Sequence, residues 1–141
     1  MAREAYITGV GQSEVGVRLP RHPLLLTMDA INVALKDAGL TLDQIDGVFS
    51  FPGKSNGYLA FSPVGTDEVI EACGIKSKWQ MGAMEQPAQL SAIGMAAMAV
   101  KEGLCRHVIC FRTVYEAGGM ANPAEYMPLQ QKETSGFSQW T

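Results

Sequence analysis

The sequence predicts an α/β fold with a mostly parallel sheet. Short runs rich in β-branched and aromatic residues alternate with longer segments whose apolar residues recur at helical spacing, from Ala5 to Arg112. Glycines follow the helical segments, as they do at helix ends. One of these segments has almost no charge, which is unusual for a helix that covers a sheet. With 141 residues, the chain has about the length of one domain.

The first expected elements form a strand, a helix and a second strand. Residues 5–10, AYITGV, are β-rich and lead into a glycine-containing turn. A helix follows Pro23 and ends at Gly39, and a capped single turn is expected at 41–44. Residues 46–51 then form the second strand. The helix is predicted from apolar residues at helical spacing: Leu24, Met28, Ile31 and Leu35. This order predicts a right-handed parallel crossover.

The same alternation continues to Arg112. Residues 52–63 are rich in Gly, Ser, Asn and Pro and predict a loop. A helix is expected from an N-cap at Thr66 to Gly74, followed by a short buried strand at 79–81. After the next helix, residues 107–112 form a fourth strand. The expected order of strands and helices is therefore βαβαβαβ.

The pattern changes after Arg112. Residues 113–141 contain a Gly-Gly pair, two prolines and no strong period. We therefore divide the chain into residues 1–112, the first part of a domain, and residues 113–141, the start of a loop region. We expect the chain to be part of a longer protein.

Composition excludes several classes of function. The formal net charge of −3 argues against a nucleic-acid-binding protein, which would be basic. No run of about 18 apolar residues predicts a membrane span, and no apolar segment after Arg3 predicts a secretory signal. We therefore expect a cytoplasmic protein.

The cysteines predict neither a disulfide framework nor a metal site. Cys73, Cys105 and Cys110 are odd in number, form no C-x-x-C motif and have no histidine at ligand spacing. Cys110 lies in the apolar run HVICF and is expected to be a small buried residue. We expect no metal in this chain.

The segment between Gln86 and Val100 carries no charge. A helix that is apolar on all sides is normally buried on all sides. Gly94 and the alanines around it allow neighbouring backbones to approach closely. Two interpretations account for this pattern: the helix lies between two sheets, or it packs against its copy in a dimer. A core helix with an unusually small exposed face is the alternative.

Two stretches resemble a known family. DAGLTLDQIDGV at 37–48 and AAMAVKEGLCRHVICFR at 96–112 resemble the N-terminal half of the thiolase superfamily, and more narrowly its lipid-transfer-protein/sterol-carrier-protein-x branch. The resemblance implies the first-half βαβαβαβ unit of an αβαβα five-layer sandwich, in which the uncharged helix is central. It also implies a homodimer in which the strand at 79–81 pairs with its two-fold copy.

The resemblance directs attention to Glu85 and Gln86. The family places its acyl-accepting cysteine at the start of this helix, and an ungapped match puts Gln86 there, with Glu85 just before it. Glutamine cannot form a thioester, so thiolysis through an acyl-cysteine is not expected. We take Gln86 as a candidate hydrogen-bond donor to a thioester oxygen and Glu85 as a candidate base. An acid and an amide before Pro87 also suit a plain helix start, and this structural interpretation stays open.

The resemblance leaves three functions open. The first is an enzyme that acts on C–C bonds of acyl-CoA thioesters by retro-aldol cleavage, with coenzyme A thioester as substrate. The second is an acetyl-CoA acetyltransferase or 3-ketoacyl-CoA thiolase-type acyltransferase. The third is a non-catalytic subunit that supports a partner, for which the family suggests a zinc-ribbon/OB-fold protein. We expect the 141-residue piece to be inactive by itself.

Overall fold

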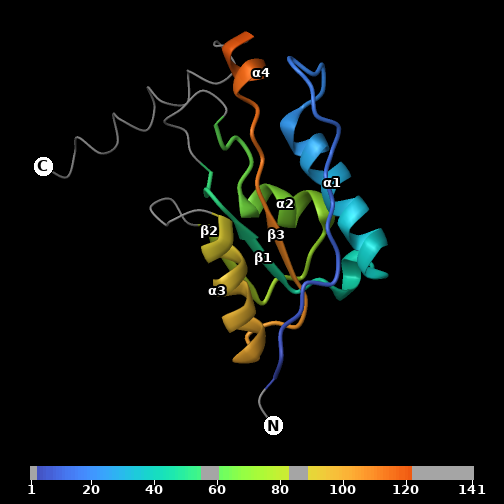
Figure 1. The fold of residues 1–141 in the computed structure, drawn as a ribbon, viewed down its shortest axis with the longest axis vertical. Coiled ribbons are helices and arrows are strands. Elements are labelled where there is room, and N and C mark those ends of the chain that lie inside the picture. Colours follow the sequence, from blue (N-terminus) through green and yellow to red (C-terminus); the bar gives the residue numbers. More distant parts are fainter. Residues whose placement is uncertain (1–2, 55–60, 83–88, 122–141) are drawn as a thin grey trace, which may run out of the picture.

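A three-stranded parallel sheet organises the chain (Figure 1). The computed structural model describes residues 3–54, 61–82 and 89–121. The strands are β1 (Gly47–Ser50), β2 (Trp79–Gly82) and β3 (Val108–Phe111), in the order β2-β1-β3. The helices are α1 (Pro23–Ala38), the 3₁₀ turn η1 (Leu42–Gln44), α2 (Thr66–Cys73), α3 (Gln89–Lys101) and α4 (Glu116–Ala121). The predicted parallel α/β arrangement is confirmed within the described residues.

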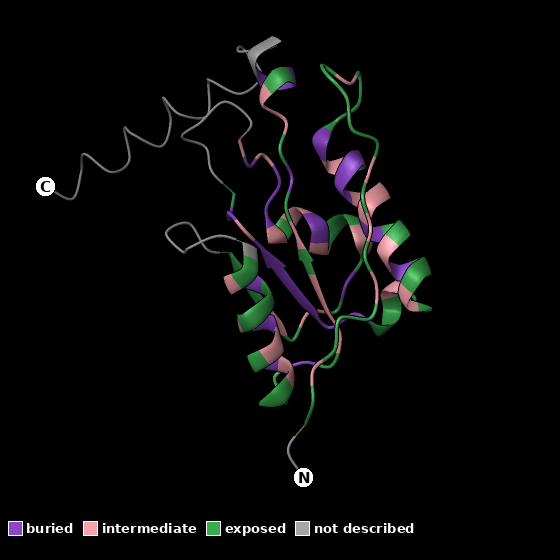
Figure 2. Ribbon diagram, in the orientation of Figure 1, coloured by how far each residue is buried: buried purple, intermediate pink, exposed green. Residues whose placement is uncertain are grey.

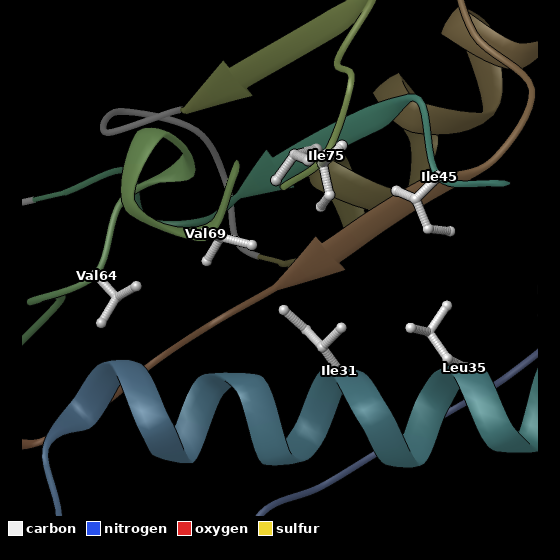
Figure 3. Close-up of a cluster of buried hydrophobic side chains, with 7 residues drawn as sticks. Ile31, Leu35, Ile45, Val64, Val69 and Ile75 are labelled. Atoms are coloured by element: carbon white, nitrogen blue, oxygen red, sulfur yellow. The ribbon is translucent and has the colours of Figure 1, made fainter. Parts of the chain in front are cut away.

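Helices α1 and α2 cover one face of the sheet, and α3 covers the other (Figure 1). The first face holds the main core, where Ile31 and Leu35 of α1 meet Val48 of β1 and Val69 of α2 (Figure 3). Val48 and Val69 are fully buried. Side chains alternate along a strand, so Phe49 points to the face that α3 covers.

The local signals that predicted α1 are confirmed. His22 is the N-cap residue, and its Nδ1 accepts a hydrogen bond of 3.2 Å from the N–H of Leu24. Pro23 occupies the first helical position, where its missing N–H costs nothing. Gly39 ends the helix in the left-handed region with φ of 66°, and the N–H of Leu40 reaches back to Leu35. The predicted turn at 41–44 is also present, as η1.

The predicted strand at 5–10 is wrong. This segment runs extended along the outside of α1 and joins no sheet (Figure 1). Gly9 and Gly11 lie so close to the helix that a Cβ on either would come within 2.3 and 2.1 Å of carbonyl oxygens of Ala34 and Ala30. A strand needs a partner for its ladder of hydrogen bonds, and the backbone of α1 cannot supply one. The crossover predicted from this strand is therefore not formed.

Helix α3 is present, and within the described residues only the side that faces the sheet is buried. Ala92, Ala96 and Ala99 are buried on the side that faces the sheet. Leu90 and Met98 are 79% and 65% exposed. Buried and exposed residues therefore alternate along the helix (Figure 2). The three alanines let α3 approach the strands closely, while its apolar outer face is left uncovered by the described residues.

Three smaller predictions also need correction. The N-cap of α2 is Gly65 rather than Thr66, and its N–H donates to Glu68 Oε2 at 2.9 Å. Strand β2 lies at an edge of the sheet, so Met81 is exposed rather than buried. Beyond Arg112, helix α4 occupies part of a region that was expected to be a loop.

Candidate functional site

The carboxyl ends of the three strands meet at one edge of the sheet. Ser50 ends β1 and stands in register with Gly82 of β2 on one side and Phe111 of β3 on the other. Open parallel sheets bind ligands beyond this edge, because the loops that leave the strands there surround a common space. The carboxyl edge, which we define by Ser50, Gly82 and Phe111, is therefore the candidate site.

Ser50 is unusual among the buried polar residues. It is 1% exposed, and its Oγ is the sole buried side-chain nitrogen or oxygen in the described parts of the chain that has no hydrogen-bond partner. Leaving a buried hydroxyl unpaired costs about 1–3 kcal/mol. Such groups are rare in folded proteins and call for an explanation.

The other buried hydroxyls of the described residues all have partners. Ser62 Oγ donates to the carbonyl oxygen of Pro52 at 3.0 Å and so ties down the start of the loop after β1. Thr27 and Thr113 share a hydrogen bond of 2.5 Å between their hydroxyls, which joins α1 to the segment after β3. The missing partner at Ser50 is thus specific to that position.

Two further contacts shape the segments next to this edge. The Arg112 guanidinium lies over the ring of Phe61, with 5.4 Å from Cζ to the ring centroid. The Tyr115 hydroxyl donates to the carbonyl oxygen of Leu19 at 2.8 Å. Tyr115 therefore holds the segment that precedes α1. Arg112 places a positive charge next to the last residue of β3.

The opposite, amino edge of the sheet is built around Asp46. Its Oδ1 accepts hydrogen bonds from the N–H groups of Arg106 and His107 at 2.7 and 2.9 Å, and its Oδ2 accepts from Lys78 Nζ at 3.1 Å. Burial raises the pKa of this carboxyl, but the bonds from His107, Arg106 and Lys78 outweigh burial and hold the pKa below its usual value of 3.8. Asp46 therefore ties the starts of all three strands together.

The sequence-predicted catalytic residues Glu85 and Gln86 lie outside the described residues. The segment 83–88 connects Gly82, at the carboxyl edge, to Gln89, the first residue of α3. The two histidines are not brought together: His22 caps α1, and His107 precedes β3 at the amino edge. His107 therefore lies at the edge opposite the candidate site, and the His22 side chain is used in capping α1.

None of the three cysteines has the environment of an activated nucleophile. Burial raises the pKa of Cys73 and also that of Cys105, where the charge of Asp46 adds to the effect. Cys110 was predicted to be buried but is exposed, because it lies on β3 at the edge of the sheet. Its sulfur nevertheless lies against α3, 4.0 Å from the Ala92 carbonyl oxygen, and desolvation there raises its pKa to about 11. The thiolate form is disfavoured at all three positions.

The described residues contain neither a metal-binding cluster nor a membrane-spanning helix. No group of three or more His, Cys, Asp or Glu side chains in residues 3–54, 61–82 and 89–121 is placed to hold a metal ion. Among the helices in the same ranges, none is long and apolar enough to cross a bilayer.

Many unrelated proteins have a parallel α/β fold with a site at the carboxyl edge of the sheet. Comparison with known proteins narrows the class of protein to which this chain is similar. No protein-family model matches the sequence. The chain is similar to two proteins, one named as an aldolase that cleaves steroid side chains and the other as a lyase of a carboxyl-CoA compound.

The first of these relatives is the steroid side-chain-cleaving aldolase of Thermomonospora curvata, 27% identical over 119 residues. The second is the 17-hydroxy-3-oxo-4-pregnene-20-carboxyl-CoA lyase of Mycobacterium tuberculosis, 30% identical over 125 residues. The matches cover 82% and 85% of this chain but 28% and 30% of the relatives, so the chain spans less than a third of their length.

A solved structure agrees with these sequence matches. A chain of the Ltp2-ChsH2(DUF35) aldolase superposes with a TM-score of 0.65 at 28% identity, over 77% of this chain and 27% of that one. The fold and the sequence therefore point to the same group of relatives. The stretches at 37–48 and 96–112 were the signal in the sequence that anticipated this group.

Proposed function

We propose that this chain is part of an acyl-CoA carbon–carbon lyase that cleaves β-hydroxyacyl-CoA thioesters by a retro-aldol reaction. The observation that supports this most strongly is the similarity of more than four fifths of the chain to proteins named as an aldolase and a CoA-thioester lyase. The absence of a cysteine from the start of the uncharged helix supports the same reaction class, because retro-aldol cleavage needs no acyl-enzyme.

The proposed reaction balances without a further reagent. A base removes the proton of the β-hydroxyl group, and a carbonyl forms as the bond between the α and β carbons breaks. The electron pair of that bond passes to the thioester as an enolate, which is then protonated at the α carbon. The products are an aldehyde or ketone and a shortened acyl-CoA. Hydrogen-bond donors to the enolate oxygen lower the barrier.

Glu85 and Gln86 are the residues that we propose for this chemistry. Gln86 would donate a hydrogen bond to the thioester oxygen, and Glu85 would act as a base. Their place in the chain supports this, because they lie between Gly82, which ends β2 at the carboxyl edge, and the first residue of α3.

The substrate class and the assembly are also proposals. The names of both curated relatives support a steroid side chain as the acyl group. The name Ltp2-ChsH2(DUF35) aldolase supports a second protein of the DUF35 type, which agrees with the expectation of a partner protein. That this partner has a zinc-ribbon/OB-fold structure stays part of the proposal. The exposed edge of β2 and the apolar outer face of α3 are consistent with a homodimer and with a five-layer thiolase-like sandwich, respectively.

The test uses the full-length protein together with any partner that copurifies. It is offered the CoA thioester of a β-hydroxylated steroid side chain without free coenzyme A, and in a second reaction a 3-oxoacyl-CoA with free coenzyme A. We expect ketone and shortened acyl-CoA from the first and no reaction in the second. Thiolysis of the 3-oxoacyl-CoA, or no cleavage of the first substrate, would contradict the proposal.

The residue roles are tested in the same assay. Glu85→Gln and Gln86→Ala should each lower the cleavage rate about 100-fold or more, which is the usual range for loss of acid–base catalysis or of an oxyanion donor. Glu102→Gln is the control, because Glu102 is an exposed acid just beyond the far end of α3. Full activity of the first two variants would leave these residues a purely structural role.

A further inference from the structure

We propose that the Ser50 hydroxyl at the carboxyl edge is a ligand-contacting group that hydrogen-bonds an oxygen of the bound acyl-CoA thioester. The inference rests on the proposed function for the identity of the ligand. It rests on the structure for the residue, because Ser50 is the buried hydroxyl of the described residues that the fold itself leaves without a partner.

The position of Ser50 favours a ligand over a role in the fold. It is the last residue of the central strand, in register with the last residues of both neighbours. The described segments that follow β1 and β3 therefore begin next to this hydroxyl. A buried serine with a purely structural role would be expected to bond a nearby carbonyl, as Ser62 does with Pro52.

Gly82, next to the Ser50 hydroxyl, has no side chain that would fill the space beside it. A Cβ placed on Gly82 would lie 3.6 Å from Ser50 Oγ and 3.3 Å from the Cα of Gly53. Gly82 is itself exposed, so the Ser50 hydroxyl lies next to an accessible position that has no side chain. A ligand atom that occupies this space comes within reach of the hydroxyl, whereas a methyl group at position 82 would fill it.

The hydroxyl suits an oxygen of a thioester ligand. Serine offers one donor and two acceptor lone pairs, so it can donate to a carbonyl or enolate oxygen or accept from a hydroxyl group. Within the described parts of the chain, no hydrogen-bond partner uses these capacities at Ser50. Loss of this one hydrogen bond should weaken binding by about tenfold, the usual range for one hydrogen bond.

The chain offers a matched control in Ser62. Ser50 and Ser62 are both 1% exposed, and Ser→Ala removes the same atom from each. Ser62 already bonds the carbonyl oxygen of Pro52. Ser62→Ala should therefore lower the melting temperature and leave ligand binding by the folded protein unchanged. Ser50→Ala should leave the melting temperature unchanged or slightly raised and should weaken binding.

The experiment measures ligand binding and turnover separately. The probe is the CoA thioester of a steroid side chain that lacks the β-hydroxyl group and so cannot be cleaved. Its dissociation constant is measured for the full-length wild-type protein, Ser50→Ala, Ser62→Ala and Gly82→Ala. We expect about tenfold weaker binding for Ser50→Ala and Gly82→Ala, and wild-type binding for Ser62→Ala.

Equal affinity of Ser50→Ala and wild type would overturn the inference, and so would wild-type affinity of Gly82→Ala. Failure of the wild-type protein to bind the probe would overturn it as well. Failure of the proposed function has a different signature. If the wild-type protein binds the probe through Ser50 but releases no ketone from the β-hydroxylated thioester, the lyase proposal is wrong and the Ser50 assignment holds.

Discussion

The two ends of the same three strands are built in opposite ways. At the amino edge, the Asp46 carboxylate accepts three hydrogen bonds from residues next to the other two strands. At the carboxyl edge, four residues further along the chain, the Ser50 hydroxyl forms no hydrogen bond with any described residue. The amino edge is closed by internal bonds, whereas the carboxyl edge retains unused hydrogen-bonding capacity. Stability and ligand binding are therefore assigned to opposite ends of the sheet.

Loss of the Asp46 carboxylate should have the largest effect. Asp46→Ala leaves the N–H groups of Arg106 and His107 without their acceptor, so we expect a loss of about 3 kcal/mol in the free energy of unfolding. Urea denaturation of the full-length protein measures it. The control is Asp29→Ala, which removes an exposed ion pair with Arg21 and should cost at most about 1 kcal/mol. Equal effects of the two variants would show that Asp46 does not close the amino edge.

The pH dependence of stability should follow the pKa of Asp46. Because the folded-state pKa lies below the usual value of 3.8, the ionised carboxylate stabilises the fold above that value. This contribution is lost as the pH falls through the lower, folded-state pKa. Asp46→Asn should therefore be less stable than wild type at pH 7, and the difference should shrink below about pH 4. A stability difference that stays constant from pH 7 to pH 3 would contradict this.

The smallest expected effect concerns Cys105, which reports whether the amino edge is closed. It is 2% exposed, and burial together with the Asp46 charge raises its pKa. Iodoacetamide should therefore alkylate Cys105 more slowly than a free thiol at pH 7.5, and Asp46→Ala should accelerate the reaction by opening the edge. Mass spectrometry of peptides locates the label. Unchanged alkylation of Cys105 in a destabilised Asp46→Ala protein would show that the edge stays closed without the carboxylate.

How far the sequence predicts this fold depends on how local each signal is. Helix α1 follows from its apolar spacing, from Pro23 at its start and from Gly39 at its end, all within one segment. The segment 5–10 has equally clear β-rich composition, yet it forms no strand. Composition shows that a segment suits a strand but does not provide the neighbouring strand whose backbone it must bond.

The candidate site was less predictable than the fold. In the sequence, Asp46 looks like a turn residue because it precedes Gly47. Its role at the amino edge could not be predicted, because its partner Arg106 lies 60 positions away along the chain. Ser50 carries no sequence signal at all, since an unpaired hydroxyl can be recognised only after every neighbour has been placed. Glu85 and Gln86 came from the resemblance to a family, and their roles stay predictions.

The contrast between the two edges is tested most directly by hydrogen–deuterium exchange of the full-length protein with and without the uncleavable CoA thioester. The account predicts that the ligand slows exchange at the carboxyl edge, in peptides that contain residues 50–53, 82 and 111–113. Exchange at 45–47 and 105–107, at the amino edge, should not change. Protection confined to the amino edge, or equal protection at both edges, would contradict the assignment of ligand binding to the carboxyl end of the sheet.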